Sequence, residues 1–320
     1  MSLQEDIFHL TDDKRNTIEQ LMQAGRRDVP DFCAEGVNEV IYIPVKDGEL
    51  RVFHHIPEKV VFKRPILFMP GYIAKPETWV DFHKPHHGLC EYYYLESREK
   101  ASSRMKNRMK VKLTIKESAN DLVKVIDFLG LNKRDYLLIA SSYGGGIVFQ
   151  ALIDKQIDPP TIVVFDPIAQ WVYTKKFTNF ISLITPPFIL GILRNLIAKI
   201  YLAKMENLAQ KKRFIAFAKG TEAWKFRKCT NQNKRFDIRD KLSEITEEIA
   251  IFHGPLDKYH PREAYYNFAK AIPKGRFFFM DTADENRELL AGVVGTEYAR
   301  LTKDEDTPET LKQFEIKIKR

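Results

Sequence analysis

The residues that could carry out covalent chemistry lie in one glycine-rich stretch, Ile139 to Gly146, which reads IASSYGGG. Within it, Ser142 stands between the small residues Ala140 and Gly144, after one apolar run and before another. A serine at such a junction is typical of a nucleophile held on a tight turn between a strand and a helix. The stretch therefore predicts Ser142 as a nucleophile for acyl transfer.

A serine nucleophile normally depends on a carboxylate and a histidine further along the chain. Asp257, at the end of the sequence HGPLD, is well placed for the carboxylate. The sixty residues that follow His260 contain no histidine. The sequence thus provides a nucleophile and an acid without the usual base between them.

Apolar runs and helical patterns alternate along most of the chain, and they define the elements that must position these residues. The runs expected to form buried strands are 65–69, 92–95, 136–139, 161–165, 249–252 and 277–280. Helices are expected over 4–24, 114–130, 146–153 and 262–271, and a hairpin is expected around Asp47 and Gly48. Residues 313–320 are expected to form a frayed helix or a short strand. This alternation predicts a mostly parallel sheet with helices on both faces.

The composition is that of an ordinary soluble protein. The chain has 320 residues, of which 44% are hydrophobic and 29% charged, as in a soluble globular protein. Its three cysteines are scattered, which predicts free thiols in a reducing compartment, and the N-terminus lacks the pattern of a secretory signal. We therefore expect a cytoplasmic protein, and we expect no cofactor.

The net charge of +8 is concentrated in two clusters, at residues 98–112 and 211–235. Such clusters favour an anionic partner such as nucleic acid, lipid headgroups or an acidic substrate. A solvated basic face is the simpler interpretation. Because no nucleic-acid-binding motif accompanies the clusters, nucleic acid is not an expected partner.

These landmarks, in this order, resemble the α/β-hydrolase superfamily over residues 36–300. Pro70-Gly71-Tyr72 stands where that family has a His-Gly pair and an oxyanion-hole residue, and Thr78-Trp79 follows at a familiar spacing. Residues 94–103 stand at the family's Asp-x-Arg-Gly-x-Gly-x-Ser loop without its glycines. The resemblance implies an α/β-hydrolase fold with four parts: an N-terminal helical extension (1–35), a first core part (36–169), a helical cap insertion (170–245) and a second core part (246–320).

The resemblance also implies roles for individual residues. Ser142 would be the nucleophile and Asp257 the acid, while the backbone N–H groups of Tyr72 and Tyr143 would form the oxyanion hole. Where the family has its histidine, this chain has Asp284 or Glu285. A carboxylate facing Asp257 could have its pKa raised by like-charge repulsion, but it is a poor substitute for imidazole as a base.

Other histidines offer no clear replacement. His253 ends an expected strand, where a structural role is the simpler interpretation, and His260 is expected to begin the next helix and face away. His83, His86 and His87 form an H-x-x-H-H pattern that a transition metal could bind. We interpret these three as a surface cluster, because no further ligand stands at a fixed spacing, and we predict no metal site.

The expected cap contains an apolar run, residues 177–193, that is broken by two prolines and flanked by basic residues. This run could lie on an anionic membrane surface, or it could pack on the core and roof the pocket, which we favour. Either arrangement implies a largely apolar ligand such as an acyl ester.

The sequence supports two functions about equally. One is a serine hydrolase, esterase-like or lipase-like, that acts on a hydrophobic ester or thioester with a degenerate triad. The other is a catalytically inactive hydrolase-fold protein that binds an apolar ligand, a membrane surface or a protein partner. A basic adaptor without the hydrolase chemistry ranks third.

Overall fold

The computed structural model describes residues 7–173, 219–254, 262–301 and 305–320, and a few positions between 185 and 215. Ten strands among these residues form one sheet in the order β1-β2-β4-β3-β6-β7-β8-β9-β10, with β5 paired to β2. Strands β4, β3, β6, β7, β8 and β9 are parallel neighbours, and the flanking pairs are antiparallel. Their bounds are β1 Glu39–Val45, β2 Gly48–His55, β3 Ile66–Met69, β4 Tyr92–Leu95, β5 Arg104–Met105, β6 Leu137–Ser141, β7 Thr161–Phe165, β8 Ile249–His253, β9 Gly275–Phe279 and β10 Glu315–Ile316.

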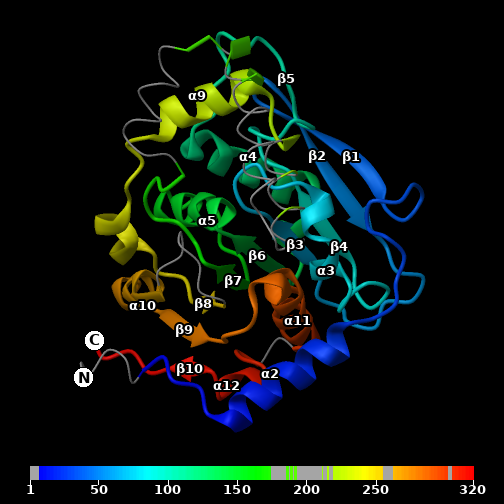
Figure 1. The fold of residues 1–320 in the computed structure, drawn as a ribbon. Coiled ribbons are helices and arrows are strands. Elements are labelled where there is room, and N and C mark those ends of the chain that lie inside the picture. The colour runs from blue at the N-terminus through cyan, green and yellow to red at the C-terminus, as the bar shows by residue number, and fades with distance from the viewer. Residues whose placement is uncertain are drawn as a thin grey trace.

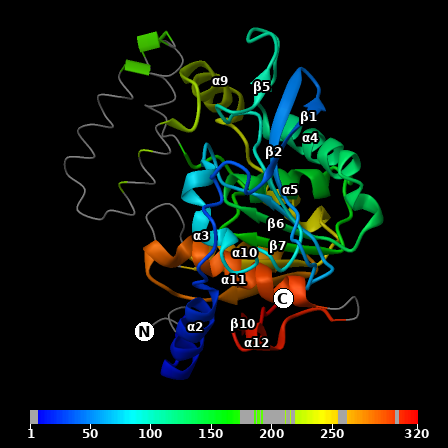
Figure 2. The same cartoon turned by 90° about the vertical axis from the view of Figure 1, so that its right-hand side faces the viewer.

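Helices cover both faces of this sheet (Figure 1). On one face lie α4 and α5, packed against each other, and on the other lie α3 and α11, with α2 against α11 (Figure 2). The predicted parallel sheet flanked by helices is therefore confirmed. The helix bounds are α2 Asp12–Gly25, α3 Val80–His83, α4 Ile115–Phe128, α5 Tyr143–Ile153, α9 Ala223–Asn233, α10 Arg262–Ala271, α11 Arg287–Arg300 and α12 Glu309–Lys312.

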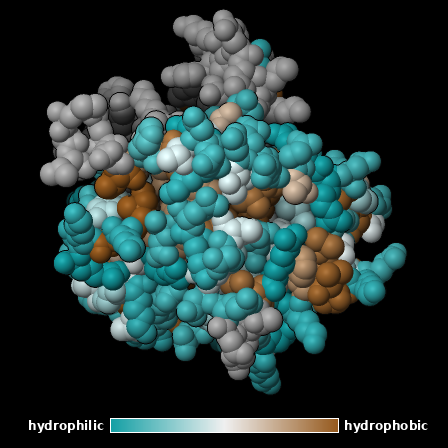
Figure 3. All heavy atoms as spheres, turned by 90° about the horizontal axis from the view of Figure 1, so that it is seen from below, coloured by the Kyte–Doolittle hydropathy of each residue, from teal (hydrophilic) through white to brown (hydrophobic). Residues whose placement is uncertain are grey.

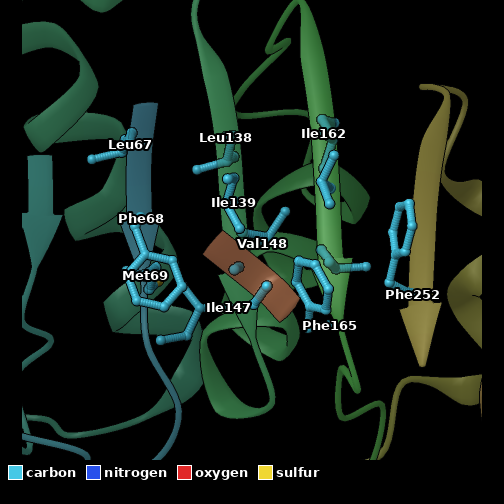
Figure 4. Close-up of a cluster of buried hydrophobic side chains, with 14 of the residues drawn as sticks. Leu67, Phe68, Met69, Leu138, Ile139, Ile147, Val148, Ile162, Phe165 and Phe252 are labelled. Atoms are coloured by element: carbon cyan, nitrogen blue, oxygen red, sulfur yellow. The ribbon is translucent and has the colours of Figure 1, made fainter. Parts of the chain in front are cut away.

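The central strands are apolar because both of their faces are covered. Side chains from β3, β6, β7 and β8 meet those of α5 in one buried cluster (Figure 4). Within this cluster Phe68, Ile139 and Val148 have no solvent exposure. This packing fixes the carboxyl ends of β6, β7 and β8 side by side, which is where the candidate residues lie.

The ends of the helices and strands show where the local sequence was sufficient to predict the boundary of an element. The Thr114 hydroxyl accepts from the Glu117 N–H at 3.1 Å and caps α4, and Gly130 follows α4 with φ of +65°. Helix α2 begins at Asp12 and the described residues 7–11 before it are not helical, whereas residues 4–6 of the predicted helix lie outside the described part of the chain. The C-terminal tail forms the short strand β10, which is one of the two expected alternatives.

Helix α5 begins three residues before the expected position of Gly146. The glycines that suggested a turn belong instead to the first turn of the helix. A Cβ at Gly144 would lie 2.4 Å from the Met69 carbonyl oxygen, and one at Gly145 would lie 2.6 Å from Cβ of Pro167. The glycines are therefore needed because neighbouring backbone approaches the helix closely.

The basic cluster at 98–112 is not one solvated face. Arg98 is fully buried and donates hydrogen bonds to Asp121, at 2.6 Å for one pair, and to the carbonyls of Lys112 and Lys46. Lys100 is also buried and pairs with Glu99 at 3.1 Å. The interpretation as a solvated face holds only for the rest of the cluster, since these two cations brace loops from within.

The histidine cluster is likewise internal, so its interpretation as a surface feature was wrong for two of its members. His83 and His86 are buried, and His83 stacks on Phe32 with ring centroids 3.7 Å apart. His87 is only half-buried. No metal-binding group of His, Cys, Asp and Glu occurs among the residues that the structure describes. The same residues include no helix long and apolar enough to cross a membrane.

His86 should make the fold sensitive to mild acid. Burial lowers the pKa of His86 from 6.5 to about 3, so between these pH values the unfolded chain binds a proton that the folded chain excludes. Stability is therefore retained above pH 6.5 and lost as the pH falls. Denaturant titrations at pH 7 and pH 5 should show that His86 contributes about 2 kcal/mol to this loss.

Testing this contribution requires a variant that lacks the His86 imidazole and therefore cannot bind this proton. His86→Gln should lose about 2 kcal/mol less than the wild type between pH 7 and pH 5. His9→Gln, at an exposed position, is the matched control and should follow the wild type. An unchanged pH dependence in the His86 variant would contradict this prediction.

Candidate active site

Ser142 occupies a strained turn between β6 and α5. Its backbone has φ of 51° and ψ of −110°, which a residue with a Cβ rarely adopts. The Ser142 N–H donates to the Phe165 carbonyl at 2.9 Å, and the Ser142 carbonyl accepts from Gly146 and Ile168. Such strain persists only where the surroundings enforce it, and it is concentrated at functional sites.

The loop after β3 lies directly against this turn. A Cβ placed on Gly71 would be 3.4 Å from the Ser142 Cβ, so a larger residue there would crowd the serine. Tyr72 follows in this loop, and Tyr143 is the first residue of α5, where amide groups have no carbonyl partner within the helix. The backbone thus brings the segments of both predicted oxyanion donors, Tyr72 and Tyr143, next to Ser142.

A buried ion pair braces the loop that carries Tyr72. The Lys100 ammonium donates to the Gly71 carbonyl and pairs with Glu99. The Glu99 carboxylate in turn accepts from the Ile73 N–H at 3.4 Å and from the Ser97 hydroxyl at 2.9 Å. These bonds hold the 71–73 backbone in place, and they replace the glycines that the sequence lacks between 96 and 103.

The Ser142 hydroxyl has a partner that sequence reasoning missed. Its Oγ lies 2.8 Å from the Tyr173 hydroxyl, and either group can donate. Tyr173 stacks on Tyr72 with ring centroids 4.6 Å apart and meets Trp171 edge-on at 5.2 Å. Burial raises the pKa of Tyr173 well above its ordinary value, so the phenol is neutral at pH 7. No recurring pattern around Trp171 and Tyr173 marks this contact in the sequence.

The predicted acids do not meet the serine hydroxyl among the described residues. Asp284 and Glu285 lie in a single helical turn before α11, where Glu285 is exposed and Asp284 half-buried. Neither is hydrogen-bonded to Ser142 Oγ. Asp257 and His260 lie outside the described residues. The role of these carboxylates therefore remains a prediction.

A second polar group lies beside the turn, at the ends of β7 and β8. Asp166, with φ of 45°, accepts from Nδ1 of the buried His253 at 2.5 Å. Its other carboxylate oxygen accepts from Arg287 at 2.6 Å. Arg287 immediately follows the loop expected to supply the missing base, so this loop delivers a guanidinium to Asp166. The other ring nitrogen of His253, Nε2, is buried and has no hydrogen-bond partner among the described residues.

Aromatic rings also pack around Tyr72 and Tyr143, the residues whose segments flank Ser142. Tyr143 and Trp171 have ring centroids 6.4 Å apart, and Phe226 lies 6.4 Å from the Tyr72 ring. A cavity of about 550 Å³ lies elsewhere, at the amino ends of the strands, and is lined in part by Arg64 and Asp135. The structure describes residues 170–173 and 219–245 of the predicted cap and a few positions between them, and α9 lies in the second of these stretches. The apolar run 177–193 lies mostly outside the described residues.

Comparison with known proteins supports this architecture. An esterase from Exiguobacterium antarcticum superposes with a TM-score of 0.62 at 16% identity, covering 82% of this chain and 100% of that one. A hydrolase from Pseudomonas aeruginosa gives 0.63 at 12% identity, with coverages of 82% and 99%. An esterase from Thermogutta terrifontis gives 0.60 at 16% identity, with coverages of 80% and 95%.

No protein-family model and no curated protein sequence matches the chain. The likeness is therefore one of three-dimensional structure at low sequence identity, and it concerns the fold rather than the reaction. The predicted architecture is confirmed by it: this chain has the α/β-hydrolase fold.

Proposed function

We propose that this protein is a serine hydrolase for hydrophobic acyl esters or thioesters, in which Tyr173 takes the place of the usual imidazole beside the nucleophile. The observation that carries the proposal is the 2.8 Å hydrogen bond between Tyr173 and Ser142, whose backbone is held in a strained turn. A residue kept at this turn only for shape could equally be Ala or Gly, neither of which would make this hydrogen bond. The esterases and lipases among the structural neighbours support the same reaction class.

The neutral phenol determines how such a reaction proceeds. Tyr173 does not take the serine proton at pH 7, because its own pKa is raised by burial. Hydroxide therefore removes that proton, and the phenol donates a hydrogen bond to the resulting alkoxide. The alkoxide attacks the carbonyl carbon, and the N–H groups of Tyr72 and Tyr143 donate hydrogen bonds to the resulting oxyanion. The intermediate then collapses, the C–O or C–S bond breaks, and the leaving alcohol or thiol departs after taking a proton from water. A second hydroxide attacks the acyl-serine and releases the carboxylate product and the free serine. Turnover is slow at neutral pH, since no general base assists.

The walls of the site favour an apolar acyl group. Tyr72, Trp171, Tyr173 and Phe226 gather around the serine, and Tyr72 and Tyr143 are buried. Aromatic rings provide large apolar contact surfaces with few polar groups to satisfy. An acyl chain is therefore a better fit than a charged or sugar substrate.

The stacked aromatic rings also favour a second function, a non-catalytic protein that binds an apolar ligand. Ser142 is only 9% exposed and its hydroxyl is already hydrogen-bonded to Tyr173, so an apolar ligand can pack on the aromatic rings without reacting. In a purely binding protein the same hydrogen bond would be permanent. Reactivity of the serine separates the two functions.

A fluorophosphonate probe tests the nucleophile directly. We expect the wild type to be labelled at one site per chain and Ser142→Ala not to be labelled, with mass spectrometry as the readout. Tyr173→Phe should be labelled roughly 10- to 100-fold more slowly, because a hydrogen bond to a charged oxygen contributes about 1.5–3 kcal/mol.

Tyr136→Phe, a buried tyrosine far from the serine in the fold, is the matched control and should be labelled at the wild-type rate. A short panel of p-nitrophenyl esters should follow the same order. Absence of both labelling and turnover in the wild type would reject the hydrolase and leave the binding protein.

The pH dependence of turnover tests the role of hydroxide. With no imidazole at the serine, kcat/KM should rise about tenfold per pH unit between pH 7 and pH 9, without a plateau. The Tyr173→Phe variant should give a parallel line at lower rates. A plateau with an apparent pKa near 7 would show that a histidine acts as the base and would contradict the proposed mechanism.

A further inference from the structure

We infer that the exposed basic loop, residues 104–112, together with the start of α9, is a docking surface for a bilayer of anionic phospholipids. The loop contains five exposed cations, and the sequence has no acidic residue from Lys100 to Lys116. The inference does not depend on the proposed hydrolase activity.

Most of the loop's charge is uncompensated among the described residues. Arg104 pairs with Glu49 at 3.5 Å and Arg108 with Glu222 at 3.8 Å, both in exposed positions. The other three cations of the loop have no ion-pair partner there: Lys106, Lys110 and Lys112. Exposed lysines near an anionic membrane each strengthen binding, and they do so without a fixed geometry.

The tip of the loop is apolar. Met109 stands between Arg108 and Lys110, and its side chain is 89% exposed, so it contributes almost no packing to the fold. Its backbone is nevertheless held in place, because Lys228 donates to the carbonyls of Arg108 and Met109 at 2.7 and 2.8 Å. A fixed apolar side chain surrounded by cations suits the boundary between headgroups and acyl chains.

Further apolar side chains lie at the start of α9 and at the described positions of the cap near it. The Arg108 guanidinium lies 5.3 Å from the ring of Trp224, in the first turn of α9. In the cap, Phe188 is 70% exposed and Ile192 65% exposed. The cap approaches α9 here, since a Cβ placed on Gly191 would be 3.7 Å from the Ala223 methyl group. The exposed Met109 at the centre of the cations favours a lipid surface, because a flexible aliphatic side chain gives no flat ring for a nucleic-acid base to stack on.

The docking surface lies at the end of the sheet that carries Ser142. Lys225 of α9 donates to the carbonyls of Lys100 and Ser103, and Lys100 donates to Gly71 beside the serine. Figures 1 and 2 both place α9 next to β5, away from α2 and α12. The face seen from below, near α2 and α12, is mainly hydrophilic with small separate apolar groups (Figure 3).

Vesicle sedimentation with the full chain tests this inference. We expect binding to vesicles of phosphatidylcholine with 30% phosphatidylglycerol and little binding to phosphatidylcholine alone. Replacing Lys106, Lys110 and Lys112 by Gln should weaken binding about 100-fold, or roughly fivefold per lysine. Met109→Ser should weaken it several-fold at constant charge.

The matched control is a triple variant with the same change of charge on other exposed elements: Lys124→Gln, Lys241→Gln and Lys270→Gln. It should bind within about threefold of the wild type, because only protein charges close to the membrane contribute strongly to binding. Equal losses in both triple variants, or equal binding to the two vesicle types, would overturn the inference.

Two further measurements separate the remaining outcomes. Ser142→Ala should bind vesicles like the wild type, so a failure of the hydrolase proposal leaves docking intact. Retention of single-stranded RNA that depends on the three lysines, without vesicle binding, would assign the loop to nucleic acid and overturn the lipid inference.

Discussion

The close approach of α5 to the ends of β3 and β7 is the constraint on which the site depends. At Gly144 a single added carbon would collide with the Met69 carbonyl, and at Gly145 with Pro167. Because the helix begins directly under these loops, the chain must turn within one residue after β6, and that residue is Ser142. The strain at Ser142 is thus set by the packing of the core, which also holds the amide groups of Tyr72 and Tyr143 near its side chain.

Buried charged side chains hold the backbone of the loops around Ser142 in position. Arg98 and Lys100 sit inside the segment after β4, and each binds backbone carbonyls from other segments. A buried ion pair contributes little net stability, since desolvation offsets attraction, but removing one partner is costly. The gain here is geometric: the 71–73 backbone is held in a defined position by a segment, 96–103, that contains no glycine. Lys225 extends the same arrangement to α9.

Much of the fold could be predicted from the sequence because its signals are local. Apolar runs such as 161–165 mark strands covered on both faces, and Thr114 and Gly130 mark the ends of one helix. The partner of the serine could not be predicted, because Tyr173 reaches Ser142 only through the tertiary fold and belongs to no recurring pattern. The contact of Arg287 with Asp166 could not be predicted for the same reason, although the adjacent acids Asp284 and Glu285 stood where the resemblance implies a base. The buried state of His83 and His86 required knowledge of the packing of α3.

The network around Asp166 has a consequence for any histidine introduced into this scaffold. A histidine introduced at position 284 would find the Ser142 hydroxyl already held by Tyr173 and the Asp166 carboxylate shared by His253 and Arg287. An imidazole at position 284 would therefore compete with partners that the surrounding segments already supply to Ser142 and Asp166, so a single substitution there would not by itself create a serine–histidine pair.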